Sequence, residues 1–201
     1  MTCKHALSMT TLALLLAGPL AAQEAKAPAM TPEMQAMMEA FQKAGTPGAQ
    51  HQQLASMTGT YDLTVKSWHG PGAEPTIDTG TATRKMILGN RVMVEEVASQ
   101  MMGQPYSGQG LHGFDNVTGK YWATWSDSMS TGLMVSEGTC DAKSTCAYTG
   151  QYHDPVTKKP QTSRMTSRWA DKSTEVFEMY APGPDGKEAR MMEITYKKRA
   201  P

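Results

Sequence analysis

The chain has 201 residues, with 19 basic and 19 acidic side chains, and 39% of its residues are hydrophobic. This length suits a single domain that buries its own core. The even charge balance indicates neither a nucleic-acid partner nor a charged membrane surface, and it does not specify an oligomeric state.

Residues 1–22 have the pattern of a bacterial secretory signal peptide. Lys4 supplies a positive start, an apolar run from Met9 to Leu20 follows, and a pair of alanines ending at Ala22 suits a cleavage site. The apolar run is shorter than the about 20 residues that a membrane span needs. We therefore expect cleavage near Ala22 and a periplasmic or secreted protein with no membrane attachment.

One short helix is predicted before the main domain. Residues 23–30 are rich in Ala, Gln, Glu, Lys and Pro, a composition typical of a flexible leader. Thr31 suits an N-cap, and Pro32 suits the first helical position. The apolar residues that follow are spaced as one face of a helix, and they are Met34, Met37, Met38 and Phe41. We predict an amphipathic helix over residues 31–44.

After this helix the apolar pattern changes to a period of two. Tyr61, Leu63 and Val65 alternate with polar residues, which is typical of a strand with one buried face. Turn sequences such as Gly89-Asn90, and loops that begin with Asp115 and Asp154, separate the alternating segments. We predict ten strands, at about 57–67, 78–88, 91–99, 105–114, 120–127, 131–139, 144–152, 161–170, 173–180 and 189–198.

These strands predict an all-β fold. No helical segment connects them, so an antiparallel meander is expected, and closing it into a barrel removes the exposed edges. We predict a lipocalin-like (calycin-type) up-and-down barrel over residues 45–201. Such a barrel either fills its interior with side chains or leaves space for one small ligand.

Two cysteines, Cys140 and Cys146, remain after signal cleavage. In an oxidising compartment an even pair at short spacing is most simply a disulfide. The polar residues between them suit a hairpin loop. A redox pair or a metal site is the alternative, but the spacing is not C-x-x-C and no histidine is close in sequence.

Several segments resemble the bacterial family catalogued as domain of unknown function 1579. They are HQQL at 51–54, LGNR at 88–91, GLHGFD at 110–115, YWATWSD at 121–127 and MEITY at 192–196. The resemblance extends over about residues 45–198 and implies a lipocalin-like fold, with no assigned activity. Tyr61 stands where the resemblance leads us to expect a tryptophan.

The strand pattern indicates one candidate ligand site. Trp122 and Trp125 point to opposite faces of their strand, so only one can line a cavity. Trp125 shares a face with Asp127, and in the preceding strand His112 shares a face with Tyr106. If both faces point inward, these four residues form an aromatic pocket with a few polar groups. The alternative is that Trp125 is core and His112 a hydrogen-bonded strand residue.

Two further sets of residues have alternative interpretations. Arg164 and Arg168 share a strand face and could clamp an anionic head group, or they could lie in solvent and pair with acidic neighbours. The methionines suit a core or a pocket lining better than copper(I) binding. No histidine spacing supports zinc, so we predict no metal and no cofactor.

Three functional hypotheses follow. The first is a barrel that binds a small apolar or amphipathic ligand. The second is an enzyme of the isomerase, cyclase or hydrolase kind in the same cavity, with His112 and Asp127 as an acid/base pair; the sequence contains no established catalytic motif. The third is a structural or partner-binding module that uses the apolar face of the helix over residues 31–44.

Overall fold

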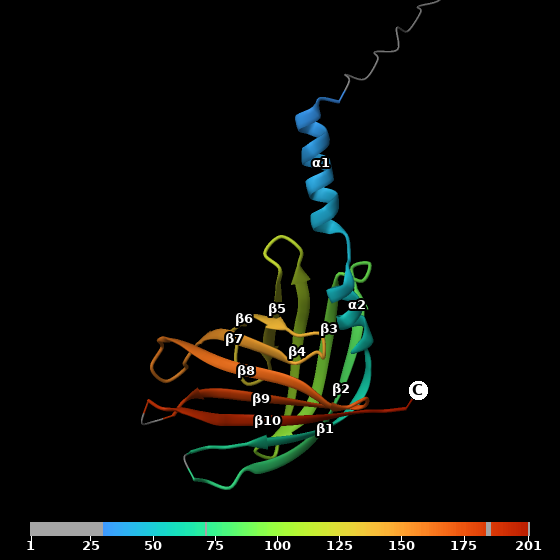
Figure 1. Cartoon of the computed structure of the whole chain (residues 1–201). Helices are drawn as coiled ribbons and strands as arrows, with labels where there is room; N and C mark the ends of the chain where they lie inside the picture. The colour runs from blue at the N-terminus through green and yellow to red at the C-terminus, as the bar shows by residue number, and fades with distance from the viewer. Residues whose placement is uncertain (1–29, 71, 184–185, 201) are drawn as a thin grey trace, which may run out of the picture.

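The protein is a closed antiparallel barrel of ten strands, as predicted (Figure 1). We describe a computed structural model, which places residues 30–70, 72–183 and 186–200. Each strand pairs with its neighbours in sequence, and the first and last strands pair to close the barrel. The strands are β1 (Gly59–Ser67), β2 (Thr76–Ile87), β3 (Val92–Met101), β4 (Gln104–Asp115), β5 (Lys120–Asp127), β6 (Met134–Cys140), β7 (Cys146–His153), β8 (Pro160–Asp171), β9 (Thr174–Pro182) and β10 (Glu188–Lys198).

The alternating sequence pattern determines which side chains fill the barrel. Tyr61, Leu63 and Val65 of β1 are buried, whereas Asp62 and Thr64 between them are exposed. The alternation of buried and exposed residues follows from strand geometry, because successive side chains of a strand point to opposite faces of the sheet. The core around β1 continues into Ala82, Val97 and Tyr196.

Two helices precede the barrel, where one was predicted. Helix α1 (Pro32–Gly45) lies within one residue of the predicted bounds, and the Thr31 side chain accepts a hydrogen bond from the Met34 N–H. Helix α2 (Ala49–Ser56) was not predicted, because it is short and only His51 and Leu54 of it are buried.

Helix α1 projects away from the barrel, whereas α2 lies against it (Figure 1). The C-terminal carbonyls of α1 are bonded by two side chains from barrel loops. Arg91 donates to the Gly45 carbonyl, and Asn116 donates to the Ala44 and Thr46 carbonyls. These bonds replace the intrahelical partners that a helix end lacks.

The apolar face of α1 is exposed rather than packed on the barrel. The exposed fractions of its apolar residues range from 49% to 72%, for Met34, Met37, Met38 and Phe41. The hypothesis that this face binds a partner therefore stays a prediction.

Helix α2 closes one end of the barrel. Leu54 packs against Met93 and Tyr121, and the Tyr121 hydroxyl donates to the Gln53 side chain at 2.5 Å. His51 is buried, accepts a hydrogen bond from the Gly48 N–H and lies edge-to-face on Phe114. Helix α2 therefore covers this end of the interior.

The predicted disulfide between Cys140 and Cys146 is present, and it joins the ends of β6 and β7. The predicted signal peptide, and all but Met30 of the leader, lie outside the described residues. Neither α1 nor α2, the helices of the described part, has the length and apolar composition of a membrane span.

Removal of the disulfide should lower stability moderately. Replacing Cys140 and Cys146 together by serine should lower the free energy of unfolding by about 2 kcal/mol, because a small ring no longer restricts the unfolded chain. Urea unfolding with and without dithiothreitol measures this. The reductant should lower the wild-type midpoint and leave the double variant unchanged; a wild type insensitive to full reduction would contradict the prediction.

Candidate functional site

The barrel interior contains a cavity of about 340 Å³. It extends from Gln53 and Met57, at the end closed by α2, to Gln100 and Asp127 near the opposite end. Gln100 is exposed, so the cavity reaches solvent there. The interior is thus partly hollow rather than filled by side chains.

Sulfur-containing and aromatic side chains form a large part of the cavity walls. Among the described residues, seven methionines line it: Met57, Met93, Met101, Met134, Met165, Met179 and Met192. The aromatic lining includes Tyr106, Tyr121, Trp125, Tyr148, Phe177 and Tyr196. Methionine is flexible and polarisable, so these walls can adapt to the shape of an apolar guest.

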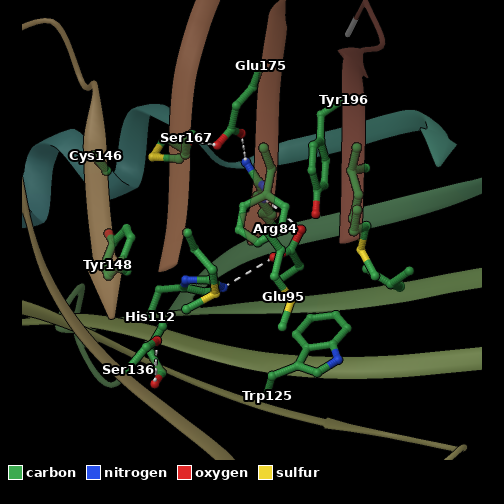
Figure 2. A pocket seen from close by; sticks show the side chains of 18 of the residues that line it. Arg84, Glu95, His112, Trp125, Ser136, Cys146, Tyr148, Ser167, Glu175 and Tyr196 are labelled. Atoms are coloured by element: carbon green, nitrogen blue, oxygen red, sulfur yellow. Dashed lines mark hydrogen bonds and ion pairs between the residues drawn. The ribbon is translucent and has the colours of Figure 1, made fainter. Parts of the chain in front are cut away.

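A buried ion cluster crosses the cavity wall (Figure 2). Arg84 of β2 donates from Nε to Glu95 of β3 at 3.0 Å, and from Nη1 to Glu175 of β9 at 2.5 Å. The other carboxylate oxygen of Glu175 accepts from the Ser167 hydroxyl. All three charged side chains are only 4% exposed, so each charge depends on these partners.

Two tyrosine rings enclose the Arg84 guanidinium. Its central carbon lies 4.9 Å from the ring centre of Tyr61 and 4.4 Å from that of Tyr196. These distances suit cation–π attraction, which is strongest where water is excluded. Tyr61 therefore provides an aromatic ring at the position where a tryptophan was expected.

The cluster keeps the Glu95 carboxylate charged and its phenols neutral. Burial alone would raise the pKa of Glu95, but the Arg84 charge and the hydrogen bond from His112 lower it to about 2. Burial raises the pKa of Tyr196 well above its usual range. Near neutral pH, Glu95 is thus an anion and cannot act as a proton donor.

His112 connects the cluster to the cavity. Its Nε2 lies 3.2 Å from the free carboxylate oxygen of Glu95, and its side chain is 25% exposed. Strand register sets this contact, because His112 on β4 pairs with Met93 on β3, two residues from Glu95. His112 therefore acts first as a hydrogen-bond partner of the ion cluster.

Two glycines allow Trp125 to lie along the wall. A Cβ at Gly108 would lie 2.3 Å from Cζ2 of Trp125, and one at Gly110 would lie 3.0 Å from Cε3. The indole ring thus rests on the backbone of β4, and its opposite face points to the interior. Trp122 packs in the same way on Gly113, but on the outer face, as alternation predicted.

Trp125, Tyr106 and Asp127 form a polar group near the open end. The Trp125 Nε1–H is shared between the Tyr106 hydroxyl at 3.1 Å and Asp127 Oδ2 at 3.2 Å. The Tyr106 hydroxyl donates to the same oxygen at 3.3 Å, and the Met129 N–H donates to Oδ1 at 2.9 Å. Asp127 is thus a fixed carboxylate at the rim.

Four of the residues predicted to form a ligand site lie in the cavity lining, and these are Tyr106, His112, Trp125 and Asp127. Their role in binding stays a prediction. His112 bonds Glu95, while the hydrogen bonds of Asp127 within the described chain go to the rim group. The hydrogen bonds of the described residues do not join His112 to Asp127, and the acid/base pair considered above stays a prediction.

Of the two interpretations of Arg164 and Arg168, the structure supports the one in which they lie in solvent, and it does not support an anion clamp in the cavity. Both are on the outer face of β8, because the inward positions there are Ser163, Met165 and Ser167. Arg164 forms a bidentate ion pair with Glu188 on the surface.

Sequence reasoning missed the three charged residues of the cluster. Each shares a strand face with apolar neighbours; Glu175, for example, alternates in phase with Phe177 and Met179. A charge on an otherwise apolar strand face was the available signal. It did not reveal that Arg84 would meet Glu175, 91 residues away.

A model of the family described as "Protein of unknown function (DUF1579)" matches residues 46–198. The chain belongs to this family. The search of curated proteins found no match.

Two solved structures extend the comparison. The crystal structure of Rv2717c from M. tuberculosis is similar at a TM-score of 0.61 and 10% identity, covering 77% of this chain and 100% of that chain. A redesigned β-barrel is similar at a TM-score of 0.37 and 9% identity, over 73% of this chain and 95% of that chain. At such identity, the likeness of this DUF1579 protein to Rv2717c shows the fold alone.

Several segments that resemble DUF1579 have structural roles here. His51 and Leu54 fix α2 to the barrel, and Arg91 binds the end of α1. The segments that contain Leu54, His112, Trp125 and Ile194 all contribute residues to the cavity lining. The segments thus hold both the barrel end and the cavity wall.

Removal of the buried Arg84 charge should lower the stability of the fold. Arg84→Met should lower the free energy of unfolding by about 3–5 kcal/mol, since it leaves Glu95 and Glu175 buried without their cation. Arg164→Met is the matched control, because it breaks an exposed pair and should change stability by less than about 1 kcal/mol. Equal losses in urea unfolding would contradict a stabilising role for Arg84.

Acid should weaken the protein through Glu95. The unfolded chain takes up this proton near the ordinary pKa of 4.5, whereas folded Glu95 resists it down to about pH 2. The stability that Glu95 contributes is thus present above about pH 4.5 and is lost as the pH falls toward 2. Glu95→Gln should unfold with a weaker pH dependence over this range. Glu96→Gln, on the outer face, should keep the wild-type pH dependence of stability. If Glu96→Gln weakened this dependence more than Glu95→Gln, the role of Glu95 would be contradicted.

Proposed function

We propose that the protein binds a small, largely apolar molecule in the barrel cavity. The observation that carries the proposal is the open volume of about 340 Å³ inside the barrel. This volume is at the lower end of the range found for small-molecule sites. A barrel built only for stability would gain from filling this space, since cavities reduce stability.

The chemistry of the walls supports an apolar guest. Methionine and aromatic side chains make up a large part of the lining, and the charges of Arg84, Glu95 and Glu175 are satisfied by one another. A guest can therefore displace poorly held water from apolar surface without breaking an ion pair.

Binding is supported better than acid–base catalysis. A general acid or base works best with a pKa near the working pH. Glu95 has a pKa of about 2, and it is buried behind Arg84 and His112.

We also propose that the protein works in the periplasm or outside the cell. The Cys140–Cys146 disulfide supports this location, because such bonds persist in oxidising compartments. The signal-like pattern of residues 1–22 agrees with it.

A cavity-filling variant tests the proposal. The neutral dye N-phenylnaphthylamine should brighten on binding the wild-type protein. Ala123 lines the cavity, so Ala123→Phe should abolish or strongly weaken the signal by occupying the space. Ala98→Phe adds the same group on the exposed outer face of β3 and should bind the dye normally.

Circular dichroism and thermal unfolding establish that both variants are folded. The proposal fails if the wild type does not bind the dye. It also fails if folded Ala123→Phe binds as tightly as Ala98→Phe, because the dye would then occupy another surface.

A further inference from the structure

The charges in the cavity lining are predominantly negative. The lining residues that the structure describes include one permanent cation, Arg84, against three carboxylates, on Glu95, Asp127 and Glu175. His112 can add at most one positive charge. The lining therefore has a net negative charge in either protonation state of His112, and its potential favours a positive guest over a negative one.

An anionic guest would find no free cation among the described residues that line the cavity. Arg84 is 4% exposed, and its guanidinium is taken up by two carboxylates and two tyrosine rings. Arg164 and Arg168 lie on the outer face of β8. A carboxylate head group would thus enter a negative site without a free cationic partner among the described residues, which is unfavourable.

The rim has the groups that bind an ammonium ion. Trp125 presents to the interior the indole face that is not covered by Gly108 and Gly110. Beside it, Asp127 accepts hydrogen bonds from Trp125, Tyr106 and the Met129 N–H. A carboxylate has about four lone-pair positions, so these three bonds fix its orientation while its charge remains. A negative aromatic face next to a fixed carboxylate suits an organic cation.

The position of this group suits an amphipathic guest. Along β5, Tyr121, Ala123, Trp125 and Asp127 face inward in order from the α2 end to the rim. A head group at Asp127 stays close to solvent, so it keeps part of its hydration. An alkyl chain attached to it would extend inward among the methionines, where burial is favourable.

We propose that the cavity selects amphipathic cations: molecules with an ammonium group at Trp125 and Asp127 and an apolar body inside the barrel. This rests on the proposed function, because it specifies the ligand class of the same cavity. The ligand is thus opposite in charge to the one that the arginine clamp would have suited.

Calorimetric titration with three probes of equal chain length tests the selection. The probes are octyltrimethylammonium, octanol and octanoate, each used below its aggregation concentration. The ammonium should bind at least about tenfold more tightly than octanoate, with octanol between them. If none of the three binds, the proposed function itself fails. If all three bind but octanoate equals or exceeds the ammonium, binding stands and the cation selection is overturned.

Two matched variants identify the source of the selection. Asp127→Asn keeps the size of the side chain and an acceptor for the Met129 N–H, and it should remove most of the preference for the ammonium while octanol affinity stays near wild type. Glu96→Gln removes an equal charge from the outer face of β3 and should leave the preference intact. Equal effects of the two variants would overturn the role of Asp127. Thermal unfolding and octanol binding verify that Asp127→Asn is folded. If it is not, two single variants, Tyr106→Phe and Trp125→Leu, replace it. Each should lower the preference for the ammonium, and the proposed site is rejected if either does not.

Discussion

The buried bonds of Arg84 are the constraint on which the rest of this barrel depends. A closed barrel of ten strands must join its first and last strands, and here β1 pairs with β10 at that junction. Arg84 on β2 passes over the rings of Tyr61 on β1 and Tyr196 on β10 to reach Glu175 on β9. One side chain therefore holds both sides of the closure together.

The cluster also explains how the interior can remain partly empty. Its bonded groups come from seven of the ten strands: Tyr61 (β1), Arg84 (β2), Glu95 (β3), His112 (β4), Ser167 (β8), Glu175 (β9) and Tyr196 (β10). Buried ion pairs add little net stability compared with apolar packing, but they require one specific geometry. We infer that the cluster fixes strand positions that continuous packing would otherwise fix, so that the space beside it need not be filled.

Local sequence pattern was enough to predict the barrel. Period-two alternation and turn residues located ten strands, and a meander of that length has no better arrangement than closure. The same alternation placed Trp125 with Asp127 on one strand face and His112 with Tyr106 on another, and the structure shows that both faces line the cavity. Helix α2 escaped prediction because its two buried residues, His51 and Leu54, form too small an apolar face to give a helical pattern.

The ion cluster could not be predicted in the same way. Arg84 and Glu95 are opposite each other across the β2–β3 hairpin, so their contact follows from local register. Glu175 reaches Arg84 only after the barrel has closed, which is a consequence of the whole fold. Alternation alone also does not state which face of β9 is inward, because Glu175 and Glu178 place an acid on each face.

The direction in which a strand face points determines whether a charged residue of the sequence contributes to the cavity. Arg164 and Arg168 are prominent in sequence, but both lie on the outer face of β8, where Arg164 pairs with Glu188. They therefore do not contribute to the cavity lining. Among the described residues, most charged side chains that line the cavity are carboxylates. The arginine among them, Arg84, is bonded to two of these carboxylates, Glu95 and Glu175. The cation that stabilises the fold is therefore unavailable to a ligand, whereas Asp127 lies in the cavity lining near the rim. The same closure that makes the barrel stable thus determines which ligand charge its cavity can accept.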